Sequence, residues 1–485
     1  MEGTLGRARE ILRTRDFALL FGARLVTQFG DGLFQACLVA SVVFAPEKQS
    51  TTLGFAKAVA ILAVPYSVLG PFAGVFIDRW SRRRILVLTP LLRAAFALLV
   101  LPGTGAAIPF YAGGLVVLSA NRFFLTTAGA VIPRLVPGGD LLVANSISTV
   151  GGTVASLVGV VVGGQLSDLI GFRPVLALTV ALWVLAPVVI VRIRSDLRPL
   201  RTIARGTVAQ DLARVWRELG EGTGRLLRTP RALAPITSVV LGQLVQGLVL
   251  VVSLVVFRDR FREGVGSFSW LVAAGGVGVG LGLLTVAPLE ARLGRRLLVC
   301  LAFAVSGAPL LGAAFAIDRI TVLVVSFAVG VGFAWMKVPA DTMTQEAIPD
   351  AYRGRVFAMY DVGNNMARVF AAVLAIGLLR ALSVTTVVAA SGALLLVWIP
   401  VIAQWMRRAA SLDVLMYAGS RADEVPRAVE IGGAQEPVEV ERSWREDRSG
   451  ARLLCFRLRL ADGSRIEVSK REGEDRWRLD RELRA

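Results

Sequence analysis

The 485-residue sequence contains no histidine, only three cysteines and few charged residues, which make up 19% of the chain. The absence of histidine excludes imidazole metal sites, Ser-His-Asp triads and imidazole proton relays. Cys37, Cys300 and Cys455 are too few and too scattered for a disulfide framework or a zinc cluster. We therefore expect a protein that is not an enzyme and that carries no metal and no cofactor.

Apolar residues are abundant: they form 55% of the chain, and the mean hydropathy is +0.64. They occur in blocks of the roughly 20 residues that an α-helix needs to cross a bilayer. Glycine is frequent inside these blocks, as is typical where membrane helices approach closely. The pattern predicts an all-α polytopic membrane protein with twelve transmembrane helices, at about 17–44, 51–77, 85–103, 108–131, 140–167, 173–191, 231–257, 266–288, 296–317, 319–347, 355–380 and 382–405.

The formal net charge of +18 is distributed unevenly along the chain. If the N-terminus is inside, 26 Lys and Arg residues flank the inner ends of the spans and seven lie in outer loops. This asymmetry follows the positive-inside rule. It predicts a multi-pass protein of the plasma membrane with both termini in the cytoplasm, and it argues against nucleic acid as the reason for the basic charge.

The sequence repeats itself at an offset of 212 residues, which pairs Asp78 with Glu290, Arg83 with Arg295 and Pro137 with Pro349. Such a repeat predicts two pseudo-symmetric six-helix bundles with a substrate site between them near the middle of the membrane. The bundles are expected at residues 1–191 and 231–406, joined by a basic cytoplasmic linker at 192–230.

Residues 407–485 have a different composition, with 17 basic and 16 acidic residues and no apolar span. Apolar and polar residues alternate in 438–441, 456–460 and 466–468, and Asp462-Gly463 favours a tight turn. We predict a small soluble cytoplasmic domain, α+β or antiparallel β, with about four strands. We interpret it as a stabilising or interaction module that contacts a cytoplasmic protein or the inner loops.

The loop after the second predicted span reads Gly74-x-x-x-Asp78-Arg79-x-Ser81-Arg82-Arg83-Arg84. It resembles the signature loop of the major facilitator superfamily, G-x-x-x-D-R-x-G-R-R, with Ser81 in place of the second glycine. A weaker copy, with Glu290, Arg295 and Arg296, follows the eighth span. The resemblance implies the fold of that superfamily and a role for both loops in its conformational change.

Further motifs are similar to those of the same superfamily. Arg122, followed by Gly129, resembles its fourth-helix arginine motif. Gly159-x-x-x-Gly163-Gly164 resembles an element of its antiporters. Close packing between helices explains Gly159 and Gly163 equally well. Segments 132–137 and 348–357 resemble the efflux branch of enterobactin exporters and macrolide-efflux-like permeases. The resemblance implies an alternating-access carrier that exports small amphipathic molecules in exchange for protons.

Charged residues inside the predicted spans are candidate site residues, because each needs a partner or a wet cavity. Asp31 lies in the first span with Gln28 and Gln35, and its repeat counterpart is Gln243. Asp31 is either a proton-coupling or substrate-binding carboxylate, or half of a fixed ion pair with Arg24, Arg93 or Arg122.

The tenth and eleventh spans carry a second set of polar residues at helical spacing. These are Lys337, Asp341, Asp361, Asn364, Asn365 and Arg368. They line the substrate cavity, or they form an interhelical salt bridge that locks the two halves.

The leading hypothesis is therefore a proton-coupled exporter of a small amphipathic drug, siderophore or metabolite. The first alternative is a lipid or lipid-linked metabolite flippase with the same fold. The second is a transporter-like membrane sensor or scaffold that signals through residues 407–485.

Overall fold

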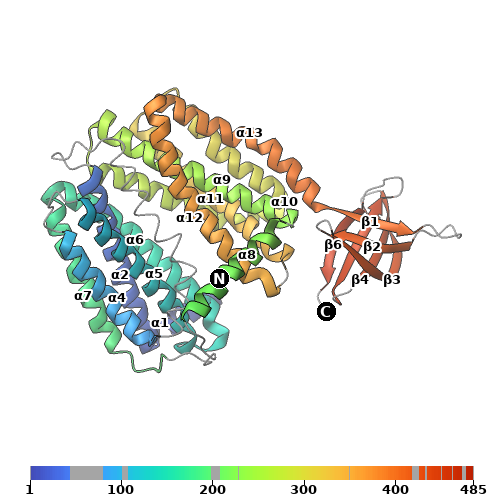
Figure 1. The fold of residues 1–485 in the computed structure, drawn as a ribbon, viewed down its shortest axis with the longest axis horizontal. Coiled ribbons are helices and arrows are strands. Elements are labelled where there is room, and N and C mark those ends of the chain that lie inside the picture. The colour runs from blue at the N-terminus through green and yellow to red at the C-terminus, as the bar shows by residue number, and fades with distance from the viewer. Residues whose placement is uncertain are drawn as a thin grey trace.

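The computed structural model describes residues 2–43, 80–100, 107–197, 208–227, 229–348, 350–417, 425–431, 434–448, 451–460, 463–471 and 477–483. Its helices form two bundles, one on each side of the view in Figure 1. The first bundle contains α1 (Glu2–Arg13), α2 (Arg15–Val43), α4 (Arg82–Val100), α5 (Ala107–Val131), α6 (Leu141–Ile170) and α7 (Phe172–Val191). The second contains α9 (Pro230–Val255), α10 (Val265–Ala313), α11 (Arg319–Ala347), α12 (Asp350–Ala381) and α13 (Val384–Ala410).

Helix α10 covers two predicted spans. Its 49 residues would extend for more than twice the thickness of a bilayer core. Gly294 interrupts it with φ 75° and ψ 157°, a backbone conformation that favours glycine, so the two arms form a hairpin. Ten helices, one of them broken in this way, thus coincide with eleven predicted spans, while the span expected at 51–77 lies outside the described residues.

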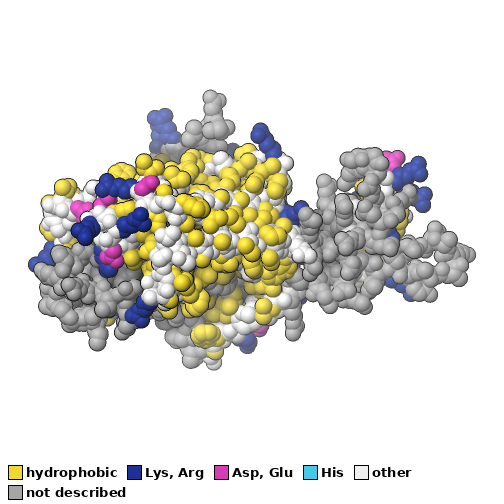
Figure 2. Space-filling model, turned by 90° about the horizontal axis from the view of Figure 1, so that it is seen from above, with side chains coloured by type: hydrophobic (Ala, Val, Ile, Leu, Met, Phe, Trp, Pro, Cys, Tyr) yellow, Lys and Arg dark blue, Asp and Glu magenta, His cyan; other side chains and the backbone are white. Residues whose placement is uncertain are grey.

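The surface of the helical part supports a membrane location. Within the described ranges, eight helical segments are long and apolar enough to cross a membrane. Large side chains such as Leu142, Leu169 and Leu284 are at least 75% exposed on them. Figure 2 shows a broad apolar face with charged side chains mainly at its margins, as expected for a protein that contacts lipid.

The predicted linker contains a helix, α8 (Val208–Leu227), which packs on α12. Arg355 of α12 donates to Glu221 over 2.6 Å, and Tyr352 lies between the guanidinium groups of Arg225 and Arg355. A Cβ on Gly222 would lie 2.6 Å from the Arg355 carbonyl oxygen, so the glycine permits the close approach. The linker is therefore partly an ordered element of the second bundle.

The C-terminal domain is a closed barrel of six antiparallel strands. The strands are β1 (Ser411–Tyr417), β2 (Val425–Ile431), β3 (Ala434–Arg448), β4 (Ala451–Leu460), β5 (Arg465–Arg471) and β6 (Trp477–Leu483). The expectation of about four strands was wrong, because β1 and β2 lack the strict alternation that marks β4. Alternate side chains such as Phe456, Leu458, Ile466 and Val468 fill the interior, and pairing of β1 with β6 removes both free edges.

Close contacts between α2 and α6 depend on glycine. A Cβ on Gly159 would lie 3.1 Å from the Cα of Gly32, and one on Gly163 would lie 2.9 Å from the Cα of Leu33. The two helices therefore pack backbone against backbone, which explains these glycines as a packing seam.

The two bundles meet where α6 ends and α10 begins, which we call the distal end. The Asp168 carboxylate accepts hydrogen bonds from the backbone N–H groups of Val265 (3.1 Å) and Gly266 (2.8 Å). Gln165 donates to the Gly266 carbonyl over 2.9 Å. Because the first N–H groups of a helix have no partner within it, Asp168 caps α10 with a side chain from the other bundle.

We expect Asp168→Asn to separate the distal ends, since the neutral amide binds the positive helix terminus less well. A cap is typically worth about 1 kcal/mol, which corresponds to a shift of about fivefold in the population of the closed state. Distances between spin labels at Arg173→Cys and Phe315→Cys, in a chain lacking the three native cysteines, measure this population.

Asp318→Asn is the matched control. Asp318 caps α11 through the Thr321 N–H (2.8 Å), which lowers the pKa of Asp318, but it bridges no bundles. Unchanged distances in Asp168→Asn, or an equal change in Asp318→Asn, would contradict a role for Asp168 in distal closure.

Candidate functional site

Asp31 is buried within the first bundle. The Gln28 amide donates to its Oδ2 over 3.1 Å, and its Oδ1 forms an ion pair with Arg93 of α4. The Asp31 side chain is 5% exposed and the Arg93 side chain is 0% exposed. Of the two interpretations of Asp31, this geometry favours the fixed ion pair, with Arg93 as the partner. Gln35, one turn further along α2, is exposed instead.

Trp183 of α7 completes the surroundings of this pair. The Arg93 Cζ lies 4.1 Å from the centroid of the Trp183 ring, and the indole N–H donates to the Thr27 carbonyl over 3.4 Å. Within the described part of the chain, Nε and Nη1 of Arg93 make no hydrogen bond. Aromatic stacking and the carboxylate therefore stabilise a guanidinium that is removed from water.

The second bundle carries a polar cluster on α11 and α12. Lys337 Nζ contacts both carboxylate oxygens of Asp341, at 3.0 and 2.8 Å, and lies 4.7 Å from the centroid of the Tyr360 ring. The Tyr360 hydroxyl lies beside Asp341 and Asn364. Tyr360 was not among the predicted site residues, although its position directly before Asp361 could have suggested it.

The remaining candidates on α12 have different partners. Arg368 Nε donates to the side chain of Gln243 on α9 over 3.1 Å, and Gln243 is buried. Asn365 donates to the backbone carbonyl of Asp361, and Asn364 Oδ1 is buried without a hydrogen bond among described residues. The spacing of three and four residues thus places these side chains along one helix, but not in one network.

Asp361 connects this cluster with the first bundle. It is exposed, and it lies within electrostatic range of Lys337, Asp341 and Arg122 of α5. Asp361 thus lies within electrostatic range of charges from both bundles, whereas Asp31 is paired inside the first bundle. Charges of both signs within electrostatic range of one another can bind a polar group or exchange a proton.

The signature loop is only partly described, and Gly74, Asp78 and Arg79 lie outside the described residues. Arg82 donates to the Ala130 carbonyl over 3.0 Å, and Arg83 donates to the carbonyls of Ile193 and Ser195. Arg84 is exposed. The start of α4 is thus tied to the ends of α5 and α7.

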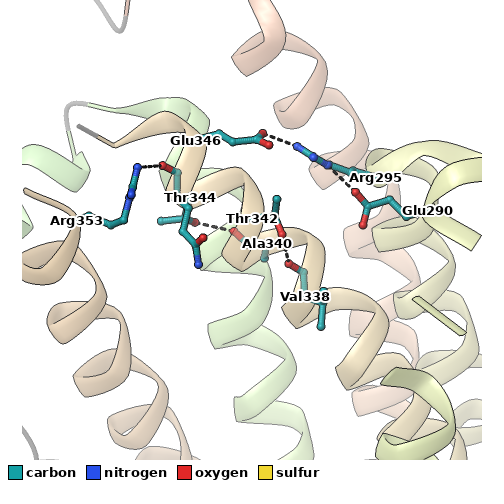
Figure 3. Close-up of polar contacts among 9 residues, drawn as sticks. Glu290, Arg295, Val338, Ala340, Thr342, Thr344, Glu346 and Arg353 are labelled. Carbon is teal, nitrogen blue, oxygen red and sulfur yellow. Dashed lines mark hydrogen bonds and ion pairs between the residues drawn. The ribbon is translucent and has the colours of Figure 1, made fainter. Parts of the chain in front are cut away.

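The second copy of this loop forms an ion-pair network, shown in Figure 3. Arg295 Nε donates to Glu290 over 2.7 Å, and Arg295 Nη1 pairs with Glu346 of α11. Arg353 of α12 donates to the Gln345 carbonyl over 3.0 Å, and Arg296 is exposed. The network joins the two arms of α10 to the end of α11.

Comparison with known families identifies one match. The profile described as Major Facilitator Superfamily matches residues 20–265 and 238–415. The MFS-type transporter Rv0037c of Mycobacterium tuberculosis is 29% identical over 369 residues, covering 73% of this chain and 82% of that protein. The MFS-type transporter YfiS of Bacillus subtilis is 22% identical over 377 residues, covering 76% and 87%.

Solved structures share the fold. A mutant of the nucleoside transporter NupG superposes with a TM-score of 0.63 at 13% identity, covering 81% of this chain and 99% of that one. A bacterial homologue of the iron transporter ferroportin, in an inward-facing state, gives a TM-score of 0.61 at 16% identity, covering 80% and 98%. A POT family transporter in complex with 5-aminolevulinic acid gives 0.64 at 14% identity, covering 82% and 97%. Since the names of these transporters differ in substrate, the likeness concerns the fold alone.

The Asp31–Arg93 pair yields a stability prediction. We expect Asp31→Asn to lower the free energy of unfolding by about 3–5 kcal/mol, because it leaves Arg93 buried without its counter-charge. The double variant Asp31→Leu with Arg93→Met replaces both charges by apolar groups and should recover most of the loss. Thermal unfolding of the purified variants in detergent measures both effects. A single variant as stable as the native protein would show that Arg93 has another partner.

Proposed function

The chain belongs to the major facilitator superfamily and is a multi-span membrane transporter, and we propose that it is a proton-coupled exporter of a small amphipathic compound in the plasma membrane. The observation that carries this proposal is the cluster of Lys337, Asp341 and Asp361, with Arg122 of the other bundle within electrostatic range of Asp361. Titratable groups between two bundles that move against each other change their surroundings during alternating access. This is the property that proton coupling requires.

Asp341 and Asp361 are the carboxylates we propose for coupling. The sequence has no histidine, so carboxylates are the groups that can take up and release protons near neutral pH. Asp361 is exposed between the bundles and faces Lys337, Asp341 and Arg122, whereas Asp31 is enclosed and held by Arg93 and Gln28. Protonation of Asp361 would weaken its attraction to Arg122 and so loosen the electrostatic link between the two bundles.

The direction of transport is proposed from the state of the distal end and from the sequence. Asp168 holds the distal ends together through the first N–H groups of α10. With the termini in the cytoplasm, the distal end is the outer one, and a closed outer end leaves the site accessible from the cytoplasm. Substrate loading from that side, together with the efflux-like motifs at 132–137 and 348–357, supports export.

The barrel is proposed to be an accessory module of this transporter. It follows α13 directly, from Ala410 to Ser411, and its apolar side chains are used to fill its own interior. Its described outer face carries cross-strand ion pairs such as Arg457–Glu467 and Arg465–Glu441. A solvated surface of this kind suits contact with a cytoplasmic protein or with the inner loops.

A growth screen of a deletion strain against amphipathic toxic compounds identifies a substrate for the transport test. Proteoliposomes with an imposed pH gradient then measure its movement. We expect Asp361→Asn to lose at least tenfold in gradient-driven transport while substrate exchange without a gradient continues, because the amide cannot carry a proton.

Asp259→Asn is the control for this measurement, since Asp259 is an exposed carboxylate paired with its neighbour Arg258 in the π-helical segment Val256–Phe261 that follows α9. It should transport as the native protein does. Full gradient-driven activity in Asp361→Asn would remove Asp361 as the coupling group. Absence of any transported compound, with a binding partner lost on removal of 411–483, would favour the sensor hypothesis.

A further inference from the structure

The interior of the membrane part contains more cations than carboxylates. Away from the ends of the predicted spans, the sequence places three carboxylates, Asp31, Asp341 and Asp361, against six cations, Arg24, Lys57, Arg93, Arg122, Lys337 and Arg368. The second predicted span, which lies outside the described residues, adds Lys57 and no carboxylate. A charge at this depth needs a counter-charge or a wet cavity, so the imbalance requires an explanation.

Two of the three carboxylates are already committed to partners. Asp31 is paired with Arg93, and Asp341 accepts both contacts from Lys337. Asp361 is the third carboxylate, and Arg122 is the arginine that lies within its electrostatic range. Arg368 is held by hydrogen bonding to Gln243.

Arg24 on α2 has no carboxylate partner within the described residues. Its Nη1 donates to the Ser148 hydroxyl of α6 over 2.7 Å, and its Nε is buried without a hydrogen bond. Gly152 leaves room for this side chain, because a Cβ there would lie 3.1 Å from Arg24 Nε. The Nε of Arg122 is likewise buried with no hydrogen bond to any described group.

We propose that the transported compound carries an anionic group, such as a carboxylate or a phosphate, which Arg24 and Arg122 bind, attached to an apolar body. This deepens the proposed transport function and rests on it. A guanidinium offers a planar fork of donors that matches these oxyanions, and the anion supplies the counter-charge that Arg24 lacks among the described residues. Ser148, which orients Arg24, is a positioning residue for the same site.

Both a soluble amphipathic anion and an anionic lipid have this chemistry. Thermal unfolding of the full chain in phosphatidylcholine nanodiscs tests binding of decyl phosphate and decanoate, with decyltrimethylammonium as the cation of equal chain length. Nanodiscs that contain phosphatidylglycerol form the lipid arm. We expect both added anions to raise the unfolding temperature and the cation to leave it unchanged. A larger rise from phosphatidylglycerol than from the soluble anions would assign the site to a lipid headgroup.

Arg24→Gln and Arg122→Gln should each weaken the apparent affinity for the anions at least tenfold. Without ligand, Arg24→Gln should be at least as stable as the native protein, because it removes a charge that has no carboxylate partner among the described residues. Arg24→Lys, which retains charge and loses the fork, should bind with intermediate affinity. Arg258→Gln changes a partly exposed arginine that is paired with Asp259 after α9, and it should bind anions normally.

Equal stabilisation by the cation, the absence of any anion effect, or unchanged anion affinity in both glutamine variants would overturn the inference. Those results leave the transport test intact, because that test uses a compound found by growth and does not assume its charge. A transporter that moves a neutral or cationic compound would therefore disprove the anionic site and retain the proposed function.

Discussion

The constraint on which the structure depends is that a charge placed in hydrocarbon must be compensated. Insertion of an arginine, lysine or aspartate at the centre of a membrane helix costs about 2.5–3.5 kcal/mol. The chain meets this cost within its first bundle by joining Asp31 to Arg93 and stacking the guanidinium on Trp183. Because these groups come from α2, α4 and α7, the same pair also fixes how three helices pack.

The second bundle compensates its charges at an accessible surface instead. Lys337 and Asp341 pair along one helix, and Asp361 faces the opposite bundle. The side chains of Lys337 and Asp341 are 29% and 27% exposed, whereas those of Arg93 and Asp31 are at most 5% exposed. This difference is the reason for assigning a packing role to Asp31 and Arg93 and for proposing a transport role for Lys337, Asp341 and Asp361.

Contact between the bundles combines close packing with a polar cap. Gly164 allows α6 to approach α10, since a Cβ there would lie 2.7 Å from that of Ser269. Asp168 then reaches the first N–H groups of α10. Such a contact is specific in geometry yet consists of few hydrogen bonds, which suits an interface that opens and closes in the proposed alternating-access cycle.

The sequence by itself determined the helical membrane architecture and the two-bundle repeat, since apolar blocks of about 20 residues have few other stable solutions. It also located the charged residues of α11 and α12 and the strands around Phe456 and Ile466. The tertiary structure alone decided which charges meet: Arg93, not Arg24 or Arg122, pairs with Asp31, and Tyr360 joins Lys337. It also closed six strands into a barrel and brought Asp168 to α10. Asp31 and Arg93 are 62 positions apart, and Asp168 and Gly266 are 98 positions apart. Helical spacing carries no information about contacts between separate helices. Only packing in three dimensions could therefore decide these pairs.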